Sequence, residues 1–163
     1  MRQLFAIFLL FISHLTTGQN SLSEGERTRI NLIDAYVKYF DEHKSSMHPG
    51  IAEGEIYNNK GEIVGGHETY IFTDEKTEKI ICIEHNESKE TYRTEHYYFL
   101  NDTLVYALVT NPIDYLLVKD SGKYYFINKK CYFFISKGNY KIIDKENLQK
   151  EADNYLKSFT ENK

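Results

Sequence analysis

The sequence lacks an excess of basic residues, since 20 lysines and arginines stand against 24 aspartates and glutamates, for a net charge of -4. Nucleic acids and anionic membranes are bound through basic faces, so this balance argues against both partners. After residue 15 the chain also lacks any apolar run of the roughly 20 residues that cross a bilayer. We therefore expect no membrane span in the mature chain and no nucleic-acid partner.

Cysteine is scarce, with only Cys82 and Cys131. In a flat meander they would lie about five strands, or roughly 24 Å, apart. A disulfide bond needs Cα atoms within roughly 7 Å, so it would require a closed sheet or another strand order. We expect two buried free thiols instead. Gly-x-Ser-x-Gly, phosphate-binding glycine loops and His-Glu-x-x-His are missing as well, and no catalytic residue or cofactor is predicted.

The first 18 residues have the pattern of a cleavable signal peptide. Arg2 gives a positive start, residues 4–15 are largely apolar, and small residues precede Gln19. The apolar run of about 12 residues is too short for a membrane anchor. We expect a secreted or periplasmic protein that starts at Gln19, with residues 19–163 forming a single α+β domain.

Two amphipathic helices are predicted, at residues 22–45 and 145–160. Ser23 and Glu26 have capping-box spacing, and Asp144 can cap the second helix. The apolar residues recur at helical spacing: Ile30, Ile33, Val37 and Phe40 in the first helix, and Leu148, Ala152, Tyr155 and Phe159 in the second.

Between the helices, residues 52–136 change to a period of two. The candidate strands are 52–58, 62–73, 78–85, 92–100, 103–109, 113–119, 123–127 and 130–136. Short turns imply antiparallel neighbours. We predict a curved antiparallel meander of seven or eight strands built from hairpin repeats, with both helices packed on one face, which makes an α+β fold.

A motif repeats every 27 residues: Tyr70-x-Phe72-x-Asp74, Tyr97-x-Phe99-x-Asn101 and Tyr124-x-Phe126-x-Asn128. Each copy is interpreted as a strand with two rings on one face, followed by an Asx turn. The rings form either a core aromatic layer under the helices or an exposed platform for a sugar, peptide or partner protein.

The opposite face of these strands is apolar too, at Tyr98, Leu100 and Tyr125. A sheet covered on one side should show one polar face, so either it curls into a half-barrel or its second face meets a partner. The candidate binding residues are therefore these three, with Glu68, Glu95 and Arg93 as a polar edge.

Histidines stand beside glutamates at His67-Glu68, Glu84-His85 and Glu95-His96. Neighbouring residues on a strand point to opposite faces, so such a pair cannot hold one metal ion together, and no metal site is predicted. Glu68 and Glu95 could act as a carboxylate pair in a hydrolase, but their equivalence also follows from the repeat.

Residues 66–136, with strings such as Tyr97-Tyr98-Phe99-Leu100-Asn101 before an apolar strand, resemble a group of secreted, Bacteroidota-like bacterial β-meander proteins without an assigned activity. The resemblance implies secretion and a meander, and no catalytic residue. The sequence thus favours a non-catalytic binding module for an envelope or extracellular protein or a small apolar ligand. The alternatives are a hydrolase of sugars or peptides, and a structural envelope component.

Overall fold

A computed structural model describes residues 22–89, 92–114, 117–137 and 145–161 of the chain. By its internal contacts the chain divides into two compact units, residues 1–32 and 33–163. The predicted signal peptide and the predicted cap Asp144 lie outside the described residues. In the described part, no helix is both long and apolar enough to cross a membrane.

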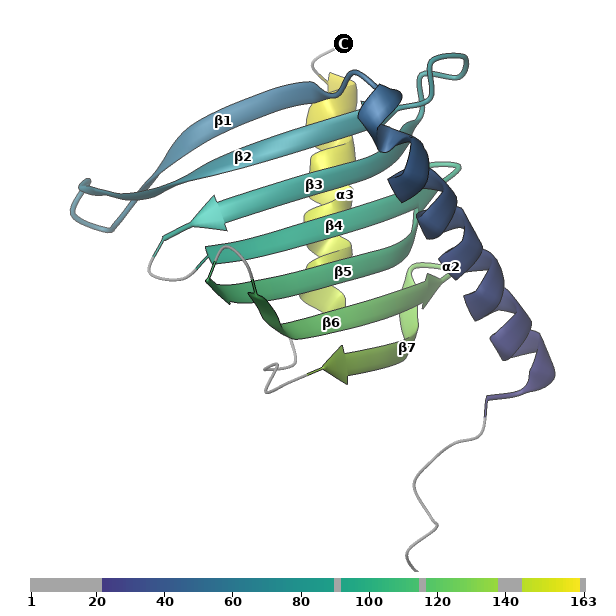
Figure 1. Ribbon diagram of the computed structural model, residues 1–163. Helices are drawn as coiled ribbons and strands as arrows, with labels where there is room; N and C mark the ends of the chain where they lie inside the picture. Colours follow the sequence, from purple (N-terminus) through teal and green to yellow (C-terminus); the bar gives the residue numbers. More distant parts are fainter. Residues whose placement is uncertain (1–21, 90–91, 115–116, 138–144, 162–163) are drawn as a thin grey trace, which may run out of the picture. The chain divides into compact units, whose positions relative to one another are not determined.

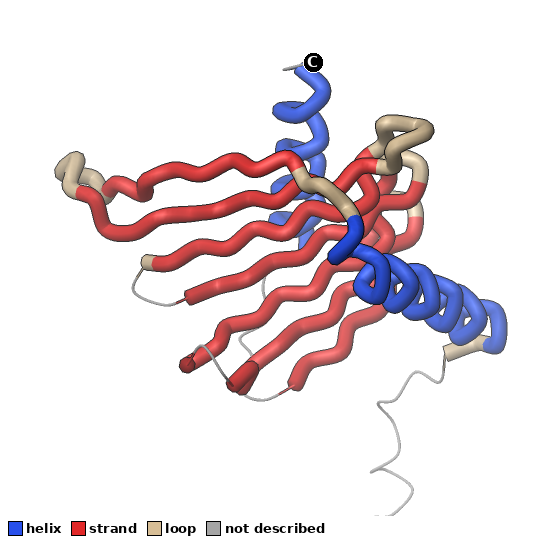
Figure 2. The backbone as a smooth tube through the Cα atoms, turned by 45° about the horizontal axis from the view of Figure 1, so that its top comes forward, coloured by secondary structure: helices blue, strands red, loops and turns tan. Residues whose placement is uncertain are grey.

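The fold is an α+β meander, as predicted (Figure 1). Seven described strands form one antiparallel sheet in chain order: β1 Gly50–Tyr57, β2 Ile63–Thr73, β3 Ile80–Ser88, β4 Tyr92–Leu100, β5 Thr103–Asp114, β6 Leu117–Ile127 and β7 Lys130–Lys137. The helices are α2 Glu24–His43, followed by the 3-10 turn η1 Lys44–Ser46, and α3 Lys145–Glu161. Figure 2 shows the strands running side by side in one sheet.

The start of α2 is fixed by the predicted capping box. The Ser23 amide donates to the Glu26 carboxylate at 2.8 Å, and the Glu26 amide donates to the Ser23 hydroxyl at 3.3 Å. Two otherwise unsatisfied backbone donors are thereby paired, which stabilises the first helical turn. The carboxylate consequently has a lowered pKa, chiefly because of the hydrogen bond from the Ser23 backbone.

The separate strand predicted at 113–119 does not exist. Residues up to Asp114 continue β5, and β6 starts at Leu117 and runs through the polar segment 120–122. Asp120, Ser121 and Gly122 pair with β5 across the sheet, so these residues form strand rather than turn. Pairing with a neighbouring strand has outweighed their local preference for turns.

The 27-residue repeat builds two-residue hairpins in its second and third copies. Asn101 and Asp102 have φ values of 52° and 58°, and Asn128 and Lys129 have 49° and 64°. Two successive left-handed residues make the turn that matches the twist of antiparallel strands, and Asn tolerates that conformation best after glycine. The first copy has a longer turn, residues 74–79, in which only Glu78 is left-handed, at 56°.

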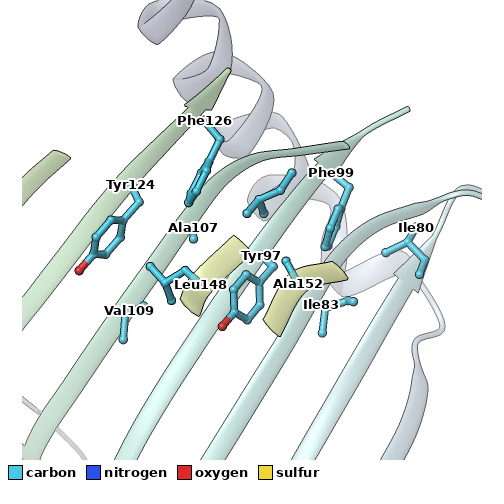
Figure 3. Packing of buried hydrophobic residues seen from close by; sticks show 11 residues of the cluster. Ile80, Ile83, Tyr97, Phe99, Ala107, Val109, Tyr124, Phe126, Leu148 and Ala152 are labelled. Carbon is cyan, nitrogen blue, oxygen red and sulfur yellow. The ribbon is translucent and has the colours of Figure 1, made fainter. Parts of the chain in front are cut away.

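The aromatic pairs of these two copies lie in the core under α3 (Figure 3). Tyr97 and Tyr124 are fully buried, and Leu148 and Ala152 of α3 pack against the same layer. Side chains alternate along a strand, so each Tyr-x-Phe pair projects to the same side. The core-layer interpretation of the repeat is therefore confirmed for these copies.

The opposite side of the sheet is covered by residues 33–43 of α2, so the expectation that both helices share one face is wrong. Phe40 is buried edge-on against Phe72 and Tyr98, with ring centroids 5.3 and 5.7 Å away. This cover explains why both faces of the strands are apolar. Neither a half-barrel nor a partner is needed to bury them.

The first repeat copy faces the other way from the second. Across β3, Tyr97 is aligned with Ile71 and not with Tyr70, so Tyr70 and Phe72 project toward α2. A shift of one residue in register exchanges the two faces of a strand. Across β3, the aligned residues Ile71 and Tyr97 are 26 positions apart in the chain, one fewer than the 27-residue repeat, and the repeat therefore does not form one continuous aromatic layer.

The two cysteines are free, as predicted. Cys82 on β3 is fully buried, whereas Cys131 on β7 is only half-buried. Cys82 is aligned with Tyr98 and so faces α2, while Cys131 packs against the core on the α3 side. Four strand spacings, roughly 19 Å, and the sheet itself separate the two thiols.

Candidate functional site

The end of the sheet beside α2 forms a pocket of about 380 Å³, here called the Leu100 pocket. It is lined by one side of α2, by the β2–β3 turn with the start of β3, and by the end of β4 with the β4–β5 turn. The lining side chains used below are those of Tyr36, Tyr39, Phe40, Asp74, Ile80 and Leu100. All of these residues lie within the unit formed by residues 33–163.

The lining of the pocket is mostly apolar and partly open to solvent. Phe40 and Ile80 are buried at its base, whereas Tyr39 is 64% and Leu100 53% exposed. Two large side chains that line the pocket, Tyr39 and Leu100, are therefore exposed to water. Small-molecule sites combine such apolar walls with a few polar groups, in volumes of roughly 300–1,000 Å³.

Polar contacts fix the geometry of the pocket. The Tyr36 hydroxyl donates to the Phe99 carbonyl at 2.6 Å and so ties the helix to the end of β4. Burial raises the pKa of Tyr36 to about 12, helped by the negative charge of Asp74, so this donor keeps its proton.

Asp74 supplies the negative group of the pocket. Its Oδ1 accepts hydrogen bonds from the Lys76 and Thr77 amides at 3.0 and 2.7 Å and from the Thr77 hydroxyl at 2.9 Å. Those bonds, led by the one from the Thr77 amide, lower the pKa of the carboxyl. The turn therefore presents a fixed carboxylate at one side of an apolar hollow.

The helix is held on the sheet by tyrosine hydroxyls. Tyr98 donates to Asp41 at 2.9 Å, and Tyr125 donates to Asp34 at 2.8 Å. Both tyrosine rings are 1% exposed, so the rings pack in the layer while the hydroxyls reach the helix surface. Burial raises the pKa of both hydroxyls, which keeps them as donors.

Next to this layer, Glu84 joins two elements electrostatically. Its Oε1 lies 2.5 Å from Lys44 Nζ in η1 and 3.3 Å from His96 Nδ1 on β4. Burial alone would raise the pKa of Glu84, but the hydrogen bonds and charges of His96 and Lys44 lower it to about 2. Sequence reasoning did not identify this contact, because nothing in the local pattern relates residue 44 to residue 84.

On the α3 side, Glu95 lies in a second polar cluster and is only 4% exposed. It forms an ion pair with Arg93, and the Tyr97 hydroxyl lies 2.6 Å from its Oε2 and 2.9 Å from Glu151 Oε2. Burial raises the pKa of Glu95, whereas the hydrogen bond from Tyr97 and the charge of Arg93 act in the opposite direction.

The six candidate binding residues are thus distributed over four places. Tyr98 and Tyr125 are buried beneath α2, and Leu100 lines the pocket. Arg93 and Glu95 lie on the α3 side, and Glu68 is exposed on β2 near the sheet edge. The structure does not bring the six together into one surface.

His67 and His85 are neighbours on β2 and β3, with ring centroids 5.5 Å apart, and His85 Nδ1 lies 2.9 Å from the Thr69 hydroxyl. Burial lowers the pKa of His85, assisted by His67. Among the described residues, no group of three His, Cys, Asp or Glu side chains is placed to hold a metal ion.

Comparison of the chain with protein-family models, with curated proteins and with solved structures finds no match in any of the three.

Proposed function

We propose that this chain is a secreted, non-catalytic binding module that takes a small, mostly apolar molecule in the Leu100 pocket. The observation that carries the proposal is an apolar hollow of about 380 Å³ beside two large side chains, Tyr39 and Leu100, that remain exposed. Covering such side chains with a ligand removes apolar surface from water and is favourable. The apolar run at residues 4–15 supports secretion.

The polar groups of the pocket indicate which ligand would fit. The lining carries charges of both signs, since the ionised Asp74 side chain accepts hydrogen bonds and the Lys79 ammonium, 3.0 Å from Asp102 Oδ2, also borders the pocket. The Tyr36 proton is already committed to the Phe99 carbonyl. A fitting ligand is therefore neutral, with an aromatic or aliphatic body and one N–H or O–H donor.

The neutral dye N-phenyl-1-naphthylamine, which has two aromatic groups and one N–H, is a suitable probe. We expect saturable enhancement of its fluorescence by the purified protein, at one dye per chain. Leu100→Lys places a charge at the pocket and should weaken binding at least about tenfold. Ile135→Lys is the matched control, because Ile135 is also an exposed side chain, at 44%, but lies on β7 away from the pocket.

Circular dichroism would first establish that both variants fold. Equal dye binding by wild type and Leu100→Lys would refute the assignment of this pocket. Equal weakening by the two lysine variants would show that the dye binds apolar surface without preference.

A further inference from the structure

The strand β1 forms an open edge of the sheet. It pairs with β2 on one side, and no other described strand pairs with its outer side, which leaves a row of backbone donors and acceptors. Edges of this kind are templates for a further strand unless proline, charged side chains (lysine above all) or a cover protects them. The other edge strand, β7, starts and ends on Lys130 and Lys137 and contacts α3. β1 contains neither lysine nor proline.

The side chains of β1 alternate between the two sides of the sheet. Ile51, Glu53, Glu55 and Tyr57 share the α2 side, because Ile51 is aligned through Tyr70 with Glu84, which contacts Lys44. All four are exposed, with Ile51 at 61% and Tyr57 at 57%. The edge therefore presents an apolar, acidic, acidic, apolar series, here called the β1 series.

A hollow of about 450 Å³ lies directly inside the β1 series. Glu55, Gly66 and Ser88 are aligned across β1, β2 and β3, and because Gly66 has no side chain it leaves space between the other two. Glu53 and Glu68 are aligned in the next row and also line the hollow. Long side chains reaching over β1 from outside would thus meet carboxylates.

We propose that β1 accepts an extended basic segment of another protein as an eighth strand. Backbone hydrogen bonds to the open edge would supply affinity, and alternate side chains would supply specificity. Two lysines or arginines of the segment would face Glu53 and Glu55, and apolar residues would face Ile51 and Tyr57. This surface is separate from the Leu100 pocket, so either proposal can fail without the other.

A second copy of this chain fits the edge less well. Antiparallel pairing of two β1 strands that matches Ile51 with Tyr57 would place Glu53 directly opposite Glu55, twice. Like charges directly opposite each other in a sheet are destabilising. A basic partner removes this repulsion, and charge complementarity therefore selects it.

The probe is the peptide acetyl-Val-Thr-Lys-Thr-Lys-Thr-Val-amide with a fluorescent label, whose sequence is the same read in either direction. Fluorescence anisotropy with the purified full chain measures its binding. Two control peptides accompany it: one with glutamates in place of the lysines, and one with the lysines kept but alternate amides N-methylated. We expect binding of the first peptide alone, because the second control cannot complete the backbone ladder.

Reversing the charge of the two glutamates in the protein provides a second test. The double variant Glu53→Lys/Glu55→Lys should bind the lysine peptide roughly 2- to 30-fold more weakly, as expected for the loss of two exposed ion pairs. The same variant should bind the glutamate peptide. Glu42→Lys/Glu75→Lys changes the net charge equally at exposed positions elsewhere and should leave binding unchanged.

Three results would overturn the proposal. Equal binding of the N-methylated peptide would show attraction by charge without strand addition. Equal weakening by the two double variants would place the contact elsewhere. No binding of the lysine peptide up to millimolar concentration would show that Glu53 and Glu55 only protect the edge.

Discussion

Glu84 gives a quantitative test of the contacts on the α2 side. The pKa of its carboxyl is lowered from 4.5 to about 2 in the folded protein, and its side chain is only 13% exposed. One unit of pKa corresponds to about 1.4 kcal/mol, so ionised Glu84 contributes about 3 kcal/mol to the free energy of unfolding near neutral pH. A glutamine of similar shape cannot supply this charge to Lys44 and His96.

The sign of the pH dependence follows from the lowered pKa. The contribution of Glu84 is fully present above pH 4.5, the value in the unfolded chain, and is lost as the pH falls toward about 2. We therefore expect Glu84→Gln to be less stable than wild type by about 2–3 kcal/mol at pH 7, with the difference nearly absent at pH 2.

Urea unfolding followed by far-ultraviolet circular dichroism at several pH values measures this difference. Glu42→Gln is the control, since its pair with Lys38 spans 3.7 Å between well-exposed side chains and should contribute less than about 0.5 kcal/mol. A stability difference for Glu84→Gln that is the same at pH 7 and at pH 2 would refute the reasoning.

Three further changes are testable by the same unfolding assay. Glu95 has a raised pKa, so its contribution to the free energy of unfolding is complete below pH 4.5 and is lost as the pH rises through the folded value. In Glu95→Gln this loss of stability with rising pH should be smaller than in wild type. Stability curves of the two proteins that run parallel over pH would contradict the prediction. Gly65→Ala should destabilise the protein by more than about 2 kcal/mol, because the added Cβ would lie 2.0 Å from the Ser88 carbonyl oxygen. At Gly25 an added Cβ would have no atom within 4 Å, so Gly25→Ala should stabilise α2 by about 0.5–1 kcal/mol. Tyr98→Phe should cost about 1 kcal/mol through loss of its hydrogen bond, and no loss would show that this bond does not hold the helix.

Element types could be predicted from the sequence because they depend on local patterns. The helix predicted at 145–160 spans Lys145–Glu161, and Leu148 and Ala152 are fully buried on it as the spacing indicated. The turns at Asn101 and Asn128 follow from the tolerance of Asn for left-handed backbone. Each of these features is decided within a few residues of the chain.

The faces of the sheet could not be predicted in the same way. Periodicity shows that side chains alternate, but which side a residue occupies depends on the register to its neighbour. Ile71, and not Tyr70, is aligned through Ile83 with Tyr97, so Tyr70 lies on the side opposite Tyr97. For the same reason, the pocket around Leu100 was not foreseeable, since α2 covers a side of the sheet that the sequence did not assign to it.

The strand order has a consequence for how the chain folds. Every pairing in the sheet joins strands that are neighbours in the chain, so each closes a short loop at small entropic cost. The helix contacts instead join residues far apart, 54 positions for Tyr97 with Glu151 and 91 for Tyr125 with Asp34. Hairpins can therefore form in succession, and the helices dock afterwards. During synthesis, the aromatic layer beneath α3 stays exposed to other unfolded chains until α3 has emerged and docks on it.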